Sequence, residues 1–289
     1  MALAFASTTM FAQDLTSKKG EPMLPEAGDW AIGFDAVPFL TYAGNLFSGS
    51  TGLNGSPNAN WINSSRQTII GKMFKDEKTA YRVQLRIGFG STNEEAQIAD
   101  ATFVGPAVFP TPPPMVTDAH KNSSHYVGLG GGMEWRRGKT RLQGFYGGDL
   151  LFWMDGSKDT YTYGNNLSTT VTAAASTNFG ANMTTDAFAN VARVTEQKNG
   201  STIGLGLRGF IGCEYFILPK ISVGAEYGWG LGFSKTGETE QTIESVGGAG
   251  PAPGTATMIT VSKQGGFSLD TDLNGNGSGS GSLVIMFHF

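Results

Sequence analysis

The chain has 289 residues, a net charge of −4 and a single cysteine. Charged residues make up 15% of it, against roughly 25% in ordinary soluble domains. Glycine occupies 42 of the 289 positions, about twice the usual share of ~7%. The acidic balance excludes a basic surface for nucleic acid, and one cysteine excludes a disulfide framework or a Cys-rich zinc module. No apolar run approaches the ~18 residues of a membrane-spanning helix. Few charges with many glycines and aromatics are typical of a β-barrel in lipid.

The first thirteen residues carry no charge. A short apolar stretch of this kind is typical of a secretory signal peptide, and we expect cleavage near Ala12 or Gln13. The positively charged start of such a peptide is missing, so residues 1–13 are interpreted as its remnant. We expect residues 14–29 to be a periplasmic N-terminal segment and residues 30–289 to form one outer-membrane barrel.

Alternation of apolar and polar residues recurs along the chain and predicts eight antiparallel strands. The clearest runs from Tyr81 to Phe89, with Val83, Leu85 and Ile87 on one face. Each strand has close to the 9–11 residues that cross a hydrocarbon core. The predicted strands are 30–40, 66–74, 81–89, 125–135, 140–153, 202–215, 221–233 and 282–289. The fold class is therefore all-β, an up-and-down transmembrane barrel.

The connections alternate between short and long. Short polar or proline-bearing turns are predicted at 75–79, 137–139 and 216–220. Long loops rich in Asn, Ser, Thr and Gly are predicted at 41–65, 90–124, 154–200 and 234–278. This sidedness is typical of outer-membrane barrels, whose short turns face the periplasm. We expect both termini on the periplasmic side and the long loops outside the cell.

Alternation alone does not say which face of each strand points outward, because a soluble eight-stranded barrel has its apolar face inside. The polar face lacks the Lys and Glu coat of a soluble exterior, and the apolar face of the clearest strands carries no charge. We therefore expect the apolar face in lipid. Aromatic residues at two levels then predict two interfacial girdles. They are Trp30, Tyr81, Trp135, Tyr215 and Phe289 near the short turns, and Phe89, Phe152 and Phe233 near the long loops.

The inward face carries charges of both signs in nearly equal number. Eight strands leave an interior that side chains just fill, and buried charges are tolerated when paired. The sequence predicts a plug of ion pairs toward the short turns, beneath a hollow lined by glycine. Its members are Arg82, Arg86, Glu134, Arg141, Arg208, Glu214 and Glu226, with Asp35 and Asp149 as further candidates. The alternative is a small conducting pore.

The strand count, the loop asymmetry and the terminal Leu-Val-Ile-Met-Phe-His-Phe289 carry a resemblance. Over residues 30–289 the chain resembles the small eight-stranded OmpA/OmpX-type outer-membrane barrels. An aromatic C-terminal residue on an alternating last strand resembles the signal read by the barrel-assembly machinery. We expect no periplasmic domain of the OmpA kind. The resemblance implies a non-enzymatic protein without cofactor, in contact with outer-membrane lipid and lipopolysaccharide, with an envelope or extracellular partner bound through the long loops.

Some barrels of this kind are lipid A-modifying enzymes that use His, Ser and an acidic residue near the loops. His125, with Ser123 or Ser124 and Asp118, supplies these residue types, which keeps an enzyme as a less favoured alternative.

Two local motifs have ordinary interpretations. Asp270, Asp272 and Asn274 match the first positions of an EF-hand loop, but the twelfth position is Gly281, so they form only a weak metal candidate. Gly204 to Gly209 matches the dinucleotide pattern GxGxxG, but inside a continuing strand. We therefore expect no bound dinucleotide.

Overall fold

The computed structural model describes an all-β protein. The described residues are 16–17, 19–36, 68–105, 111–169, 171, 179, 183–247, 254–260, 264–271 and 282–289. The strands are β1 (Trp30–Asp35), β2 (Ile69–Asp76), β3 (Thr79–Ala99), β4 (Met115–Arg137), β5 (Leu142–Thr162), β6 (Met183–Thr185), β7 (Val191–Leu218), β8 (Ile221–Thr236), β9 (Thr239–Ser245), β10 (Gly254–Thr260), β11 (Gln264–Thr271) and β12 (Ser282–His288). No helix in this part of the chain is long and apolar enough to cross a membrane. The predicted signal remnant, residues 1–13, lies outside the described residues.

Eight of the strands close into a hydrogen-bonded ring. Its order is β1–β2–β3–β4–β5–β7–β8–β12 and back to β1, with every pairing antiparallel. The two ends of the chain make the closing pair, in which Ala31 lies opposite His288. The all-β class and the eight antiparallel strands predicted from the sequence are thus confirmed.

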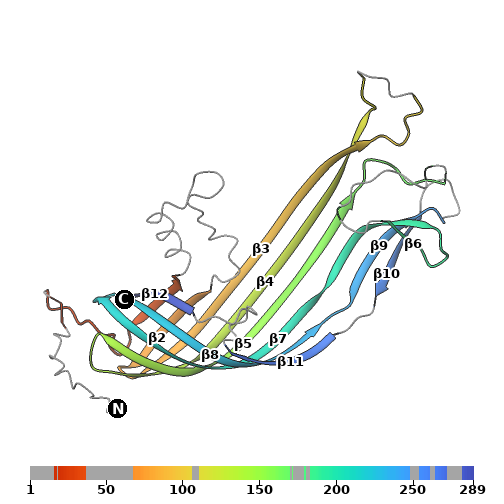
Figure 1. Ribbon diagram of the computed structural model, residues 1–289. Coiled ribbons are helices and arrows are strands. Elements are labelled where there is room, and N and C mark those ends of the chain that lie inside the picture. The colour runs from red at the N-terminus through yellow and green to blue at the C-terminus, as the bar shows by residue number, and fades with distance from the viewer. Residues whose placement is uncertain are drawn as a thin grey trace, which may run out of the picture.

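The ring is uneven and is not a regular barrel. Strands β1, β2 and β12 have 6, 8 and 7 residues, whereas β3, β4, β5 and β7 have 21, 23, 21 and 28. The ring therefore has one short side and one tall side. On the tall side the strands continue upward as a curved sheet that rises to the upper right of Figure 1.

This curved sheet, which we call the extension, comprises residues 90–99, 115–124, 154–162 and 191–200 together with β6, β9 and β10. The sequence predicted these parts of β3, β4, β5 and β7 as loops, and that extent was wrong. The β3–β4 ladder runs without a register shift from Thr79 opposite Trp135 to Ala99 opposite Met115. The prediction failed because polar residues predominate on both faces of the extension and its apolar cluster is small (Ala192, Val194 and Ile243), so the period-two hydrophobic signal is weak there.

Within the ring, successive side chains alternate between interior and exterior as the pleat requires. On β3, Arg82 is 2% exposed, whereas its neighbour Val83 is 60% exposed. The same alternation holds on β7, where Arg208 is buried and Leu207 is exposed. The apolar face therefore points outward and the charged face inward, as the sequence predicts.

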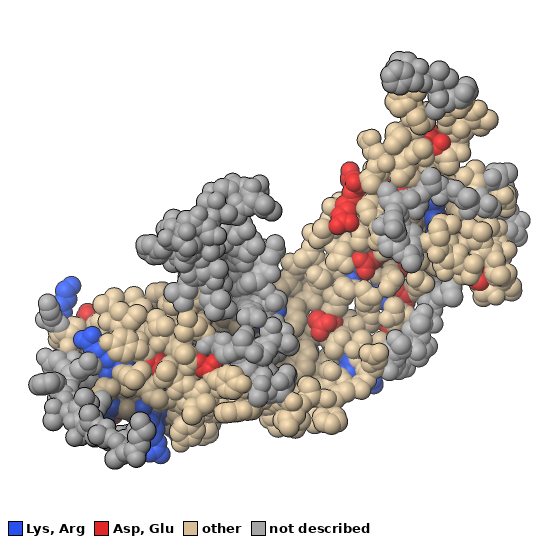
Figure 2. Space-filling view, viewed as in Figure 1, with Lys and Arg blue, Asp and Glu red and all other residues tan. Residues whose placement is uncertain are grey.

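The outward residues form a continuous set of exposed apolar side chains, which we call the outer belt. It includes Ile32, Phe34, Val83, Ile87, Leu129, Leu150, Leu205, Leu207, Ile211 and Trp229. The eight residues of the predicted aromatic girdles are also exposed: Trp30, Tyr81, Phe89, Trp135, Phe152, Tyr215, Phe233 and Phe289. In contrast, exposed Lys and Arg residues lie at the short turns, namely Lys75, Lys78, Arg137, Lys139 and Lys220. Blue side chains gather at the left end of the molecule in Figure 2.

We predict that Gly147→Ala destabilises the ring, because the strands approach too closely for a Cβ atom at this position. A Cβ on Gly147 would lie 2.1 Å from the Met133 carbonyl oxygen and 2.4 Å from the Phe210 ring. Overpacking of this kind costs about 1–3 kcal/mol. The measurement is the free energy of unfolding in urea for the detergent-solubilised protein.

Gly131→Ala is the matched control, since its Cβ would meet nothing closer than the Arg82 carbonyl oxygen at 4.0 Å. Equal stability of the two variants would contradict the close approach of β5 to β4 and β7.

Candidate functional site

Eight charged side chains from six strands meet inside the ring, and we call them the interior charge cluster. They are Lys72, Arg82, Glu134, Arg136, Asp149, Arg208, Glu214 and Glu226. None is more than 9% exposed. Four positive and four negative groups cancel, which is the condition under which buried charges are tolerated.

Glu134 on β4 is the point at which three cations converge. Its Oε2 lies 2.8 Å from Lys72 Nζ and 3.4 Å from Arg82 Nη1. Its Oε1 accepts a hydrogen bond of 2.8 Å from Arg136 Nη1. One carboxylate therefore links β2, β3 and β4 through charge-assisted contacts.

Arg82 extends the cluster to the opposite wall. Its Nη1 donates to Glu226 Oε2 at 2.7 Å, and its Nε lies 3.8 Å from Asp149 Oδ1. Arg208 Nη1 donates to the other oxygen of Glu226 and lies 3.5 Å from Asp149 Oδ2. Gln84 Nε2 donates to the same Asp149 oxygen at 2.7 Å. This half of the cluster ties β3, β5, β7 and β8 together.

Glu214 on β7 carries the cluster toward the closing strand β12. Its Oε2 accepts from Arg136 Nη1 at 2.7 Å and lies 3.5 Å from Lys72 Nζ. Its Oε1 accepts from the Ser222 hydroxyl and lies 3.2 Å from His288 Nε2. Ser222 Oγ is 2.9 Å from that His288 nitrogen. The penultimate residue of the chain is therefore held from the interior.

Phenylalanine rings enclose the cations of the cluster. The closest contact places Arg82 Cζ 3.9 Å from the centroid of the Phe210 ring. The other rings within cation–π distance are Phe74, Phe145 and Phe216. Rings in place of water strengthen each ion pair, because charges interact more strongly where the dielectric constant is low.

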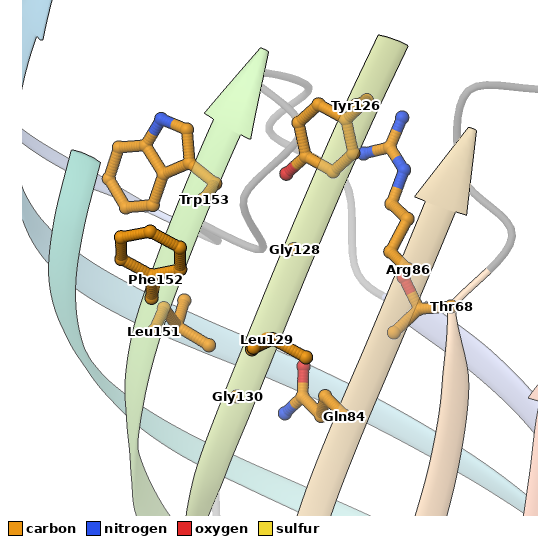
Figure 3. A pocket seen from close by; sticks show the side chains of 10 residues that line it. All are labelled: Thr68, Gln84, Arg86, Tyr126, Gly128, Leu129, Gly130, Leu151, Phe152 and Trp153. Carbon is orange, nitrogen blue, oxygen red and sulfur yellow. The ribbon is translucent and has the colours of Figure 1, made fainter. Parts of the chain in front are cut away.

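The interior around the cluster is closed in the part of the chain that the structure describes. A cavity beside Lys72, Arg82 and Glu226 has a volume of about 10 Å³. A second, above the cluster and lined by Gln84 and Arg86, has about 20 Å³ (Figure 3). Each has room for about one water molecule.

Five of the seven residues predicted to form the plug meet in this cluster, namely Arg82, Glu134, Arg208, Glu214 and Glu226, and Asp149 joins them. The other two do not join it. Arg86 lies one layer higher and stacks on Tyr126, with its Cζ 4.1 Å from the ring centroid. Arg141 precedes β5, and its buried Nε has no hydrogen-bond partner among the described residues. The side chain of Asp35 lies outside the described part.

The sequence did not identify Lys72, Arg136, Ser222 or His288 as members. Lys72 and His288 stand on the polar face of their strands, so the alternation carried a signal for both. Arg136 adjoins the predicted turn at 137–139, where a charge is ordinarily solvated. Its position at the end of β4 instead turns it inward, to 3% exposure.

The residues of the weaker predictions are dispersed. Asp270 lies in β11 opposite Gly230, whereas Asp272 and Asn274 lie outside the described residues. Among the described residues, no group of three His, Cys, Asp or Glu side chains is placed to hold a metal ion. Gly204 to Gly209 lies within β7.

The residues proposed for a lipid-modifying enzyme do not assemble. The β3–β4 ladder has no register shift, so His125 and Asp118 lie on opposite faces of β4. Asp118 is buried and accepts a hydrogen bond from the Gly164 amide at 2.9 Å. Asp118 is therefore not placed to act as the acidic partner of His125 in a catalytic relay.

The extension has a polar core of its own, centred on Arg193. Arg193 is 2% exposed, pairs with Glu244 and donates to the Asn165 carbonyl at 2.6 Å. The Asn165 side chain joins this core to the end of β3, because its Nδ2 donates to the Ala99 carbonyl at 2.9 Å. Burial raises the pKa of the Tyr163 hydroxyl, which donates to a carbonyl of β7. The extension is therefore held together by buried polar contacts and is not a solvated loop.

Comparison with known proteins identifies no family. No family model matches the chain, and no curated protein matches it. The residues themselves therefore carry the functional assignment.

We predict that Glu134→Gln lowers the free energy of unfolding by about 3–5 kcal/mol, because it leaves three converging cations short of a carboxylate. The measurement is urea unfolding in detergent. Glu77→Gln, in the exposed β2–β3 turn, is the control and should change stability by less than about 0.5 kcal/mol. An equally stable Glu134→Gln would show that the cluster does not hold the ring together.

Proposed function

We propose that this chain is a non-enzymatic outer-membrane β-barrel of the bacterial envelope. The ring spans the bilayer, the interior charge cluster closes its lumen, and the extension projects from the cell as a surface for interaction. The observation that supports this best is the inverted polarity of the ring, with apolar side chains exposed and charged side chains buried. Monomeric soluble proteins rarely expose a contiguous apolar patch of more than a few hundred Å².

Lipid accounts for the outer belt better than water does. Val83, Leu207 and Trp229 are each at least half exposed, and no charged residue interrupts the belt on the clearest strands. A cationic side chain at the bilayer midplane costs about 2–4 kcal/mol, so a lipid-facing surface excludes it. The belt ends where the extension begins, with Asn93, Glu94 and Glu95 on β3.

This orientation in the membrane determines which side each end of the ring faces. The short turns and both termini face the periplasm, and the extension faces outward. Outer-membrane lipid and lipopolysaccharide surround the belt, and the barrel-assembly machinery inserts the chain through its aromatic C-terminal strand. A rigid extension is suited to an envelope or extracellular partner, because binding residues tend to lie on exposed segments held by a scaffold.

The alternative of a small pore is disfavoured by the lumen. A conducting pathway is lined by water and commonly by one sign of charge. Here both signs are paired across the ring, and the cavities beside the cluster hold about one water molecule each.

We predict that the folding free energy of Leu207→Arg shows whether the outer belt is surrounded by lipid or by water. Leu207 is 60% exposed on the outer face of β7. In a bilayer the substitution should cost about 2–4 kcal/mol of folding free energy, whereas at a water-exposed site it should cost less than about 0.5 kcal/mol. The measurement is urea-dependent folding into phospholipid vesicles.

Gln97→Arg, exposed on the extension, is the matched control and should leave the folding free energy unchanged. If Leu207→Arg were also neutral, and the protein were monodisperse without detergent, the membrane assignment would be lost.

We predict that the wild-type protein shows no steady large conductance in planar lipid bilayers, because the charge cluster fills the ring. Folding of the sample is checked by heat-modifiable gel migration, and a general porin serves as the positive control. A stable open conductance level in most insertion events would contradict the closed barrel and favour the pore.

A further inference from the structure

Arg86 is a cation on the inner face of the ring that the interior charge cluster leaves unneutralised. It lies on β3 one layer above Arg82, whose charge is matched by Glu134, Asp149 and Glu226. Among the described residues, no carboxylate forms an ion pair with Arg86. The inward carboxylate of the next layer, Asp155 on β5, lies opposite Tyr126, and it forms no ion pair with Arg86 among the described residues.

The guanidinium of Arg86 is held in place but is not satisfied. Its Cζ lies 4.1 Å from the centroid of the Tyr126 ring, which fixes its plane. Its Nη1 is buried and has no hydrogen-bond partner among the described residues. A buried donor without an acceptor costs free energy, and most such donors in native proteins are paired with protein, water or ligand.

The surroundings of Arg86 form a small pocket with two unlike walls (Figure 3). Thr68, Gln84 and Arg86 provide the polar wall, and Leu151 with Trp153 provides the apolar one. Between them β4 presents Gly128 and Gly130, with the ring of Tyr126 over Gly128. A Cβ on Gly130 would lie 2.9 Å from Leu151 Cδ2 and 3.1 Å from Gln84 Cβ. The absent side chains therefore let the two walls face each other across β4.

We propose that this pocket binds an organic anion with one carboxylate and an apolar body. The carboxylate accepts hydrogen bonds from the planar guanidinium of Arg86, whose N–H groups match the two oxygens of a carboxylate. The cavity of about 20 Å³ admits a group the size of a carboxylate oxygen but not the body of the ligand. The body lies outside this cavity, against the partly exposed ring of Trp153. This inference goes beyond the proposed function and does not depend on where the membrane lies.

The test is titration calorimetry of the folded wild-type protein in detergent micelles with benzoate, benzyl alcohol and inorganic phosphate as probes. Benzoate should bind more tightly than benzyl alcohol, which has the same ring without the charge, and more tightly than phosphate. Arg86→Gln should weaken benzoate binding by about 10- to 100-fold, the effect of a lost hydrogen bond to a charged group. Tyr126→Phe keeps the ring beneath the guanidinium and should retain binding.

Arg137→Gln, which removes an exposed arginine at the short turns, is the matched control and should leave the affinity unchanged. Arg86→Lys keeps the charge without the fork and should bind with intermediate affinity, provided that gel migration shows it folded. Equal binding of benzyl alcohol, tighter binding of phosphate, full affinity in Arg86→Gln, or no binding of benzoate would each overturn the assignment.

Discussion

The pairing of charges inside the ring is the interaction on which the rest of the structure depends. Each carboxylate of the interior charge cluster contacts at least one cation from another strand, and Glu134 also pairs with Arg136 on its own strand. Glu134 on β4 depends on Lys72 from β2 and Arg82 from β3. Since a buried charge without its partner is heavily penalised, the ring and the ion pairs form together. His288 brings β12 into the same network, which explains why the closing strand is held although it is short.

The strands on the tall side pass through two surroundings. In the ring, β3 alternates between charged residues inside and residues such as Val83 and Ile87 outside. In the extension, the same strand carries Thr92, Asn93 and Glu94, with polar residues on both faces. Hydrogen bonding along the ladder does not change across this border, so the backbone continues while the side chains adapt. The border therefore marks where the outward side chains of the strand change from apolar to polar.

Sequence alone predicted the ring well because alternation is a local signal. Arg82, Glu134 and Glu226 were assigned inward from period two, and each is buried there. Which carboxylate meets which cation was not predictable, because that choice depends on the register of strands that lie far apart in the chain. Lys72 and Arg136, two of the four cations of the cluster, were missed for local reasons. Lys72 lies on a strand whose alternation is weak, and Arg136 adjoins a predicted turn. The extension was missed for a simpler reason, namely that its apolar cluster of Ala192, Val194 and Ile243 is too small to generate a period-two signal along the strands.

Glycine on the inner face lets large side chains from neighbouring positions lie across the ring above the charge cluster. At the level of the cluster, Phe145 and Phe210 fill the space between the ion pairs. Above it the inner positions of β4 are Gly128 and Gly130, where a Cβ would lie 3.0 Å from the Tyr126 ring and 2.9 Å from Leu151 Cδ2. Arg86 lies at this level, beside a cavity of only about 20 Å³ in the part of the chain that the structure describes. The glycines therefore narrow the space above the cluster indirectly, because they admit the aromatic rings and the leucine that occupy it.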